Sequence, residues 1–481
     1  MRRTPHLVLL AALGFTASCS TLRPIPRDQS LPAAVLDLAR ESAPPASQAS
    51  ILLAAPDRGS GSFHVWAVDA GNGVPRGQAA LDFKAPGRSM GAFALSPDGQ
   101  RLAIATGSLK YCEPSGIGTA CWDGSETVSL VDLTTGRADP IEMPRPSRIS
   151  QLAFDSTGEH LAMVVHSQGS PNLMTVDVSL ARIAGQSPLP IDPAFLAYAT
   201  DSASLVLLGS NPGSEPGLSP PGPAQVLIVR EADLSIVWTQ VIDGMHMGSW
   251  CLDNCDSTQG PPRTAIWYPA YLLQPGSDRL LVLHAEANRL SAVDIGGRLI
   301  ESMEISPAKT WVDRLMAWGT LDAEAKGWAE GAIKQAVISP DGSRLYDLGR
   351  LLHASTHQDG SMDGWEEPLG LDVVDPLDGV RLAHLDTDAW GLGMSKDGRW
   401  LLLTSSQGDG LLSEVLDAQS LEREAAFEDW QVLPVRSLEG QSLLLAYAQA
   451  ESHTRFALID PSTMLRSPPW TVEGFATVIS P

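Results

Sequence analysis

An oxygen-rich loop carries the best metal-binding pattern in the sequence. Asp359, Ser361 and Asp363 occupy alternate positions, and Gly364 and Glu367 follow them. Oxygen ligands at alternate positions, with a glycine that allows a sharp turn, are typical of loops that wrap Ca²⁺. The pattern therefore predicts a structural calcium site, and a solvated acidic loop is the alternative. The loop has no Glu at the twelfth position, so it is not an EF-hand.

No motif of a known catalytic machinery accompanies this loop. The sequence contains no G-x-S-x-G elbow, no phosphate-binding P-loop and no G-x-G-x-x-G turn after a predicted strand. We therefore predict no catalytic residues and no required cofactor. A hydrolase or lactonase-like enzyme that gathers carboxylates and histidines around a channel is the alternative, but no spacing in the sequence selects its residues.

Tryptophan is concentrated in long irregular segments and just before predicted innermost strands, which together hold nine of the 13 Trp residues. Trp is enriched among the anchors of protein interfaces, and its ring also stacks on sugars. The pattern predicts a surface that binds a protein partner, with carbohydrate binding or simple packing of the loops as alternatives. The predicted binding face contains Trp250, Trp267, Trp311, Trp318, Trp328, Trp365, Trp390 and Trp430, with Trp122 in a further long segment.

Four of the five cysteines form two close pairs in the sequence, Cys112 with Cys121 and Cys251 with Cys255. Close pairs in an exported chain favour disulfides, each of which would pin one loop. Zinc is the alternative, but neither pair has the usual C-x-x-C spacing with His or Cys partners. We therefore predict two disulfides.

A short repeat must position all of these residues. Residues 92–107, AFALSPDGQRLAIATG, read as two apolar strands joined by a Ser-Pro-Asp-Gly turn. In such a turn Pro presets φ and Gly accepts a positive φ. Degenerate copies recur along the chain, and most are followed by a second strand pair with an Asp and a turn residue between its strands, as in VSLVDLTTGR from Val128. Four short strands per unit, repeating at about 40 residues, indicate the blades of a β-propeller.

The number of first strands predicts eight blades in residues 49–481, an all-β ring. Seven blades are the alternative, because the units around Phe195 and Val432 are the most degenerate. Residues 51–70 supply a second and a third strand without a first, and residues 475–481 supply a first strand alone. The C-terminal strand should therefore complete the N-terminal blade, which removes exposed sheet edges.

Five long segments interrupt the repeat. Each lies either between the second and third strands of a unit or before the next unit, and these two connections share one face of a blade. We therefore expect the insertions on one face, which is the usual functional side of a repeat ring. The fourth has Trp residues at helical spacing, so it predicts a short helix. The insertions are residues 108–127, 211–225, 243–266, 307–334 and 351–369.

The repeat resembles the TolB-type and YVTN-type (WD40-like) repeats of bacterial propellers, in which SPDG joins the inner strands and V-x-D-x-x-T-G the outer ones. The resemblance covers residues 50–481 and implies the fold, but it implies no activity because propellers host many functions. The oxygen-rich loop in turn resembles the calcium loops of integrin-type propellers, with Ser361 in place of the usual acidic or amide residue.

The N-terminus reads as an export signal. Residues 1–18 contain Arg2 and Arg3, an apolar run and small residues, which is typical of a signal peptide. Residues 16–19, TASC, resemble the lipobox of bacterial lipoproteins, although Thr16 stands where Leu is commonest. The resemblance implies a lipid on Cys19. Because Ser rather than Asp follows this cysteine, the resemblance also implies sorting to the outer membrane. Residues 19–48 then form the lipidated Cys and a Pro-, Ala- and Ser-rich tether.

The charge balance excludes one class of partner. The chain has 33 Lys+Arg against 56 Asp+Glu, a net charge of -23, so it lacks the basic surface that nucleic acids require. We predict an exported lipoprotein, periplasmic or surface-exposed, anchored in the outer membrane by its N-terminal lipid. Its predicted function is a non-enzymatic binding or scaffold propeller for an envelope protein.

Overall fold

The computed structural model describes residues 49–57, 62–74, 83–86, 89–115, 118–143, 147–167, 170–201, 203–211, 222–253, 263–285, 287–305, 329–356, 362–407, 410–450 and 452–479. Within these ranges all the regular structure is β-strand and no helix occurs. The helix expected in residues 307–334 lies mostly outside the described residues. Residues 329–334 are described, and they belong to a strand rather than to a helix.

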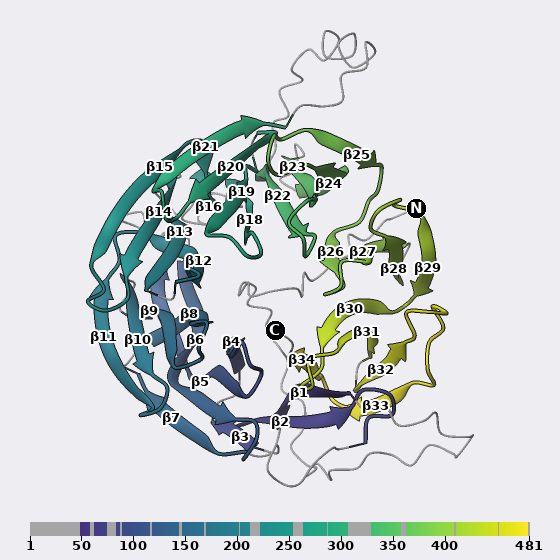
Figure 1. Cartoon of the computed structure of the whole chain (residues 1–481), viewed down its shortest axis with the longest axis horizontal. Coiled ribbons are helices and arrows are strands. Elements are labelled where there is room, and N and C mark those ends of the chain that lie inside the picture. The colour runs from purple at the N-terminus through teal and green to yellow at the C-terminus, as the bar shows by residue number, and fades with distance from the viewer. Residues whose placement is uncertain are drawn as a thin grey trace.

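Eight sheets follow one another around a ring and form an eight-bladed β-propeller (Figure 1). The predicted all-β propeller is confirmed, and the seven-bladed alternative is wrong. Blade 1 contains β34 (Thr477–Ile479), β1 (Ser50–Asp57), β2 (Ser62–Asp69) and β3 (Phe83–Pro86), and blade 2 contains β4 (Ser89–Leu95), β5 (Arg101–Ser115), β6 (Gly118–Asp132) and β7 (Ala138–Glu142). Blade 3 contains β8 (Ser147–Phe154), β9 (His160–Ser167), β10 (Ser170–Asp177) and β11 (Arg182–Pro188), and blade 4 contains β12 (Asp192–Tyr198), β13 (Ser204–Ser210), β14 (Pro223–Arg230) and β15 (Ile236–His246).

The second half of the ring repeats this arrangement, with the first strand of each blade innermost and the fourth at the rim. Blade 5 contains β18 (Ala270–Leu273), β19 (Arg279–Leu283), β20 (Arg289–Asp294) and β21 (Leu299–Glu304), and blade 6 contains β22 (Ala329–Ile338), β23 (Leu345–Thr356), β24 (Met362–Val374) and β25 (Arg381–Leu385). Blade 7 contains β26 (Gly391–Met394), β27 (Trp400–Gln407), β28 (Gly410–Asp417) and β29 (Arg423–Glu428), and blade 8 contains β30 (Gln431–Arg436), β31 (Ser442–Gln449), β32 (His453–Ile459) and β33 (Trp470–Glu473). Two extra strands, β16 (Gly248–Asp253) and β17 (Arg263–Tyr268), extend the sheet of blade 6.

The Ser-Pro-Asp-Gly turns are stabilised by their own side chains. In blade 2 the Ser96 hydroxyl donates to Asp98 and accepts the backbone N–H of Arg101 at 2.9 Å. Gly99 has a φ of 70°, in the left-handed region that favours glycine. Blade 6 repeats the serine–aspartate contact with Ser339 and Asp341. The sequence repeat is therefore also a repeat of hydrogen bonds.

The apolar core is divided among the seams between blades. Buried residues form eight clusters, and each cluster lies between two neighbouring blades. Along β9, Leu161 and Met163 pack toward blade 2, whereas Ala162 and Val164 pack toward blade 4. A second strand that is buried on both sides needs an unbroken apolar run, which explains why the sequence of β9 does not alternate.

The C-terminal strand closes the ring. In blade 1, β34 pairs antiparallel with β1, so that Ile479 lies opposite Leu52 and Thr477 opposite Ala54. Figure 1 shows β34 beside β1, with the two ends of the colour scale meeting there. The predicted closure is therefore confirmed, and it leaves the innermost edge of β1 paired.

The two faces of the ring differ in construction. One face, here called the turn face, carries the turns between first and second and between third and fourth strands. These turns also contact each other around the ring: Arg101 donates to the Gly158 carbonyl of the next blade at 2.9 Å. A Cβ atom on Gly398 would lie 2.4 Å from Pro340 Cδ of the preceding blade. The opposite face, here called the insertion face, carries the remaining connections.

Candidate functional site

Lengthened strands build up the insertion face. β5 and β6 have 15 residues each, and β23 and β24 have 12 and 13, whereas most strands of the ring have eight or fewer. Since the turn-face ends of these strands are held by tight turns, the extra length extends the blades on the insertion face. Two of the expected insertions, residues 108–127 and 351–369, are therefore partly β-hairpins.

A third hairpin comes from a different part of the ring. β16 and β17 lie between blades 4 and 5 in sequence, yet β17 pairs in parallel with β22 of blade 6. The pairing joins Thr264 to Ala329 and Tyr268 to Ile333. It uses the first half of β22, which lies at the insertion face because the turn after Ile338 lies at the other. Residues 243–266 thus contribute strands that bind the first strand of a distant unit.

The described tryptophans of the predicted binding face differ in their surroundings. Trp267 and Trp390 are partly buried, and Trp390 Nε1 donates to the Ser406 hydroxyl at 3.2 Å. Trp430 is only 6% exposed and packs between blades 7 and 8. The guanidinium of Arg466 stacks over its ring at 4.2 Å. Trp267 and Trp390 can contact a partner at the face, whereas the surroundings of Trp430 are those of a core residue.

The remaining predicted tryptophans are placed only in part. Trp250 stands in β16 opposite Ala265, and Trp365 stands in β24 opposite His353. Both positions lie on the insertion-face hairpins. Trp311, Trp318 and Trp328 lie outside the described residues, as does most of the 307–334 insertion.

A polar cluster at the seam between blades 3 and 4 was not predicted. It consists of Arg148, Ser150, His166 and Asp192, and we call it the seam cluster. Arg148 and His166 are directly opposite each other on β8 and β9. The register shifts between Ile149 and Gln151, so Ser150 is the extra residue of a β-bulge.

The contacts of the seam cluster connect the two blades. Ser150 Oγ lies 3.0 Å from His166 Nε2, and the same nitrogen lies 3.6 Å from Asp192 Oδ1 of the next blade. The His166 side chain is 16% exposed and that of Asp192 is 55% exposed. Burial lowers the pKa of Arg148, and the Asp192 carboxylate opposes that shift. The cluster therefore places a cation, an imidazole and hydrogen-bonding oxygens beside the innermost strands at the insertion face.

A second polar seam joins blades 6 and 7 at the same face. Arg350 pairs with Glu366 and donates to the backbone carbonyls of Asp388 and Ala389. Gln335 Nε2 donates to the Trp390 carbonyl at 2.9 Å, and its Oε1 accepts from Leu392 N at 3.0 Å. These bonds fix the chain on both sides of Trp390. Glutamine plays the same part in blade 3, where Gln151 donates to the Ala194 carbonyl of blade 4.

The predicted calcium loop lies only in part within the described residues. Asp359 and Ser361 lie outside the described residues. Asp363 and Glu367 both lie within the regular extended strand β24, so their Cα atoms are roughly 13 Å apart. The Glu367 carboxylate lies 2.9 Å from His353 Nε2. Across the described part of the chain, no group of three or more His, Cys, Asp or Glu residues could hold a metal ion.

The predicted cysteine pairs are placed unequally. In the β5–β6 hairpin the backbone of Cys112 lies directly opposite that of Cys121. Cys251 stands in β16 opposite Thr264, and Cys255 lies outside the described residues. No helix within the described ranges is long and apolar enough to cross a bilayer.

Comparisons with known proteins identify the fold only. A scan against models of known protein families finds no match, and a search of curated proteins finds none. The chain is similar in structure to dihydro-heme d1 dehydrogenase NirN in complex with DHE, with a TM-score of 0.52 and 12% identity over 89% of this chain and 74% of that one.

Two further solved structures were found at lower TM-scores. A eukaryotic initiation factor matches with a TM-score of 0.46 and 11% identity over 89% of this chain and 98% of its own. The β-propeller domain of Cps50 (Swd1) from Myceliophteria thermophila matches with a TM-score of 0.39 and 12% identity over 80% and 96% of the two chains. Sequence identities this low indicate a shared fold and give no information about a shared activity. The chain is therefore, by fold, a β-propeller.

Proposed function

We propose that this protein is a binding scaffold of the cell envelope, exported by residues 1–18, lipidated at Cys19 and engaging a protein partner through the insertion face. The observation that carries the proposal is the asymmetry of the ring. Hairpins β5–β6, β16–β17 and β23–β24 enlarge one face. The turns of the other face are short and are closed by hydrogen bonds between their own Ser and Asp side chains. A surface that is enlarged by three hairpins, one on blade 2 and two on blade 6, offers a partner far more area than a plain propeller mouth.

The chemistry of the insertion face fits a protein ligand. Trp390 is held by hydrogen bonds from Gln335 and to Ser406, so its ring is ordered before a partner arrives. Preordered aromatic side chains lose little entropy on binding and are common anchors of interfaces. The exposed carboxylates of Glu367 and Asp388 belong to the same face and would favour a partner that carries basic groups.

Affinity capture from an envelope extract tests the proposal. The bait is the chain from Ser20, beside a variant that lacks residues 307–328. The deletion stops at residue 328 because residues 329–334 belong to β22. Two point variants accompany it, Trp390→Ala on the insertion face and Lys396→Ala on the turn face. Lys396 is exposed and lies in the turn of the same blade, so it is a matched control.

The expected result is a protein that binds the intact chain and the Lys396→Ala variant but binds Trp390→Ala or the deletion at least about tenfold more weakly, which corresponds to about 1.4 kcal/mol. Equal capture by all four baits, or a partner lost only with Lys396→Ala, would overturn the proposal. Circular dichroism and thermal melting of each bait would verify that the variants are folded.

A further inference from the structure

The described part of the chain starts on the turn face. Ser50 is the first residue of β1, and it lies opposite Asp69, the residue that begins the turn between β2 and β3. The Ala49 carbonyl accepts the N–H of Ala70 within that turn at 3.0 Å. The chain that precedes Ala49 therefore enters the ring at the turn face, opposite the enlarged hairpins.

A turn of blade 8 fixes this entry point. The Glu439 carboxylate accepts both the backbone N–H and the hydroxyl of Ser50, each at 2.8 Å. The neighbouring Leu438 N donates to the Ser50 carbonyl at 2.8 Å. Three hydrogen bonds from one turn thus hold the first residue of β1. Because Glu439 stands in the turn between β30 and β31, the attachment belongs to the turn face itself.

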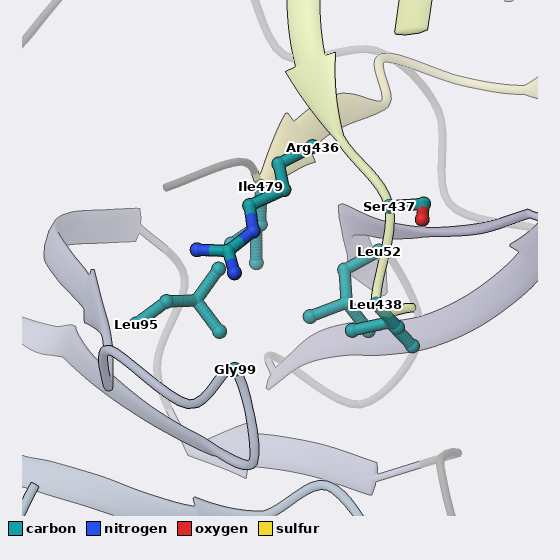
Figure 2. A pocket seen from close by; sticks show the side chains of 7 residues that line it. All are labelled: Leu52, Leu95, Gly99, Arg436, Ser437, Leu438 and Ile479. Atoms are coloured by element: carbon teal, nitrogen blue, oxygen red, sulfur yellow. The ribbon is translucent and has the colours of Figure 1, made fainter. Parts of the chain in front are cut away.

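The ring is closely packed around the entry point. Figure 2 shows Leu438 next to Leu52, with the Arg436 side chain extending toward Leu95 and Gly99. The cavity that these residues line has a volume of about 20 Å³, which is room for about one water molecule. The chain cannot pass through this seam to the opposite face, and a connection over the outer strands would run around the rim of the blade.

We infer that the lipid anchor holds the turn face toward the membrane and directs the insertion face away from it. The inference rests on the proposed lipidation of Cys19. Reaching the insertion face would take about 26 Å along the eight residues of β1, and about 14 Å more across the outer strands. The Pro-, Ala- and Ser-rich composition of the 29 residues in the range 20–48 predicts a tether with a relaxed span of roughly 30 Å. A tether wrapped in that way would have to stretch beyond its relaxed span before it reached a bilayer, whereas one that leaves the turn face directly would not.

This orientation restricts the kind of partner. A protein embedded in the anchoring membrane would meet the saturated turns and not the tryptophans of the insertion face. The partner is therefore a protein outside that membrane, either soluble or held in a facing membrane, and the scaffold presents its insertion face to it.

Energy transfer to vesicles tests the orientation. The full-length lipidated chain carries a fluorescent amino acid at Lys396 on the turn face or at Asp388 on the insertion face, the two ends of the first strand of blade 7. Each is reconstituted into phosphatidylethanolamine–phosphatidylglycerol vesicles that contain an acceptor-labelled lipid. We expect at least about twofold more transfer from position 396 than from position 388, because transfer falls steeply with distance.

Equal transfer from both positions, or more from position 388, would overturn the inference while leaving the scaffold proposal intact. Loss of the lipid on Cys19 is detected separately, because an unlipidated chain would not float together with the vesicles. The chain that begins at Ser20, labelled at the same positions, supplies the background for both donors. A Glu439→Gln variant, which keeps the hydrogen-bonding shape, should retain the ratio.

Discussion

Lys334 Nζ lies 2.6 Å from Asp347 Oδ2 inside blade 6, and the two side chains are only 6% and 4% exposed. Polar residues continue from this pair across neighbouring strands of the blade. Asp347 lies opposite Asp372, and Asp372 lies opposite His384. His384 Nδ1 lies 2.6 Å from the Asp372 carboxylate. Burial raises the pKa of Asp347, and Lys334 opposes that shift. The lysine therefore offsets part of the cost of burying this carboxylate.

Replacing Lys334 with Met should destabilise the fold. The substitution leaves Asp347 buried without its cation, a change that costs about 3–5 kcal/mol. Equilibrium urea unfolding followed by fluorescence measures the loss. The double variant Lys334→Met, Asp347→Leu should recover most of it, since both charges are then removed. A single variant as stable as the parent would show that the pair does not support blade 6.

His284 predicts an acid-sensitive contact inside blade 5. Its Nε2 lies 2.7 Å from the Ser291 hydroxyl, and its side chain is fully buried. Burial, followed by the charge of Arg289, lowers the pKa of His284 from 6.5 to about 4. The unfolded chain therefore takes up a proton at a higher pH than the folded chain does. This contribution to stability is complete above pH 6.5 and declines as the pH falls toward 4, by up to about 3 kcal/mol.

Unfolding free energies measured between pH 7.5 and 4 check this prediction. A His284→Asn variant should be less stable at pH 7.5 but should lose less stability over the same range. Parallel pH profiles for the parent and the variant would contradict the assignment of the acid sensitivity to His284.

Cys112 and Cys121 should form a disulfide in protein isolated from an oxidising compartment. Their backbones are directly opposite in the β5–β6 hairpin, and opposed residues of antiparallel strands have Cα separations that a disulfide can bridge. Peptide mapping without reduction should recover one fragment that joins the two cysteines. Recovery of both as free thiols, or of Cys112 linked to Cys251, would contradict the pairing.

Trp390 and Trp430 should respond differently to substitution. Trp430 is buried in the seam between blades 7 and 8, so Trp430→Ala should cost about 3–5 kcal/mol of stability. Trp390→Ala removes a partly buried ring at the insertion face, so it should weaken partner binding more than it weakens folding. Melting temperatures and capture assays on the two variants separate these roles. A larger loss of stability in Trp390→Ala would reverse the assignment.

The ring could be predicted because its information is local. Each Ser-Pro-Asp-Gly turn binds its own serine and aspartate, as Ser96 and Asp98 do, so every copy of the motif reports a blade by itself. The closure of β34 on β1 followed from a first strand left over at one end and missing at the other.

Features that join distant segments could not be predicted in this way. The parallel pairing of Thr264 with Ala329 has no local signature, because neither segment carries a turn that would bring them together. The seam cluster takes His166 from one blade and Asp192 from the next, at no recognisable spacing. The only local signal beside the cluster is the β-bulge at Ser150, where the alternation of side chains along β8 is interrupted. This interruption can be recognised only after the register of β8 and β9 is known. Trp430 was assigned to the binding face by its position before a first strand, but its ring packs inward.

Site-specific photocrosslinking in the envelope tests the central claim most directly. A photoreactive amino acid is placed at Asp388 on the insertion face or at Lys396 on the turn face of blade 7, and cells are irradiated before extraction. The account predicts a discrete crosslinked product from position 388 that is absent from position 396 and is lost when Trp390→Ala is added. The same product from position 396 alone, or from both positions, would contradict a binding role for the insertion face.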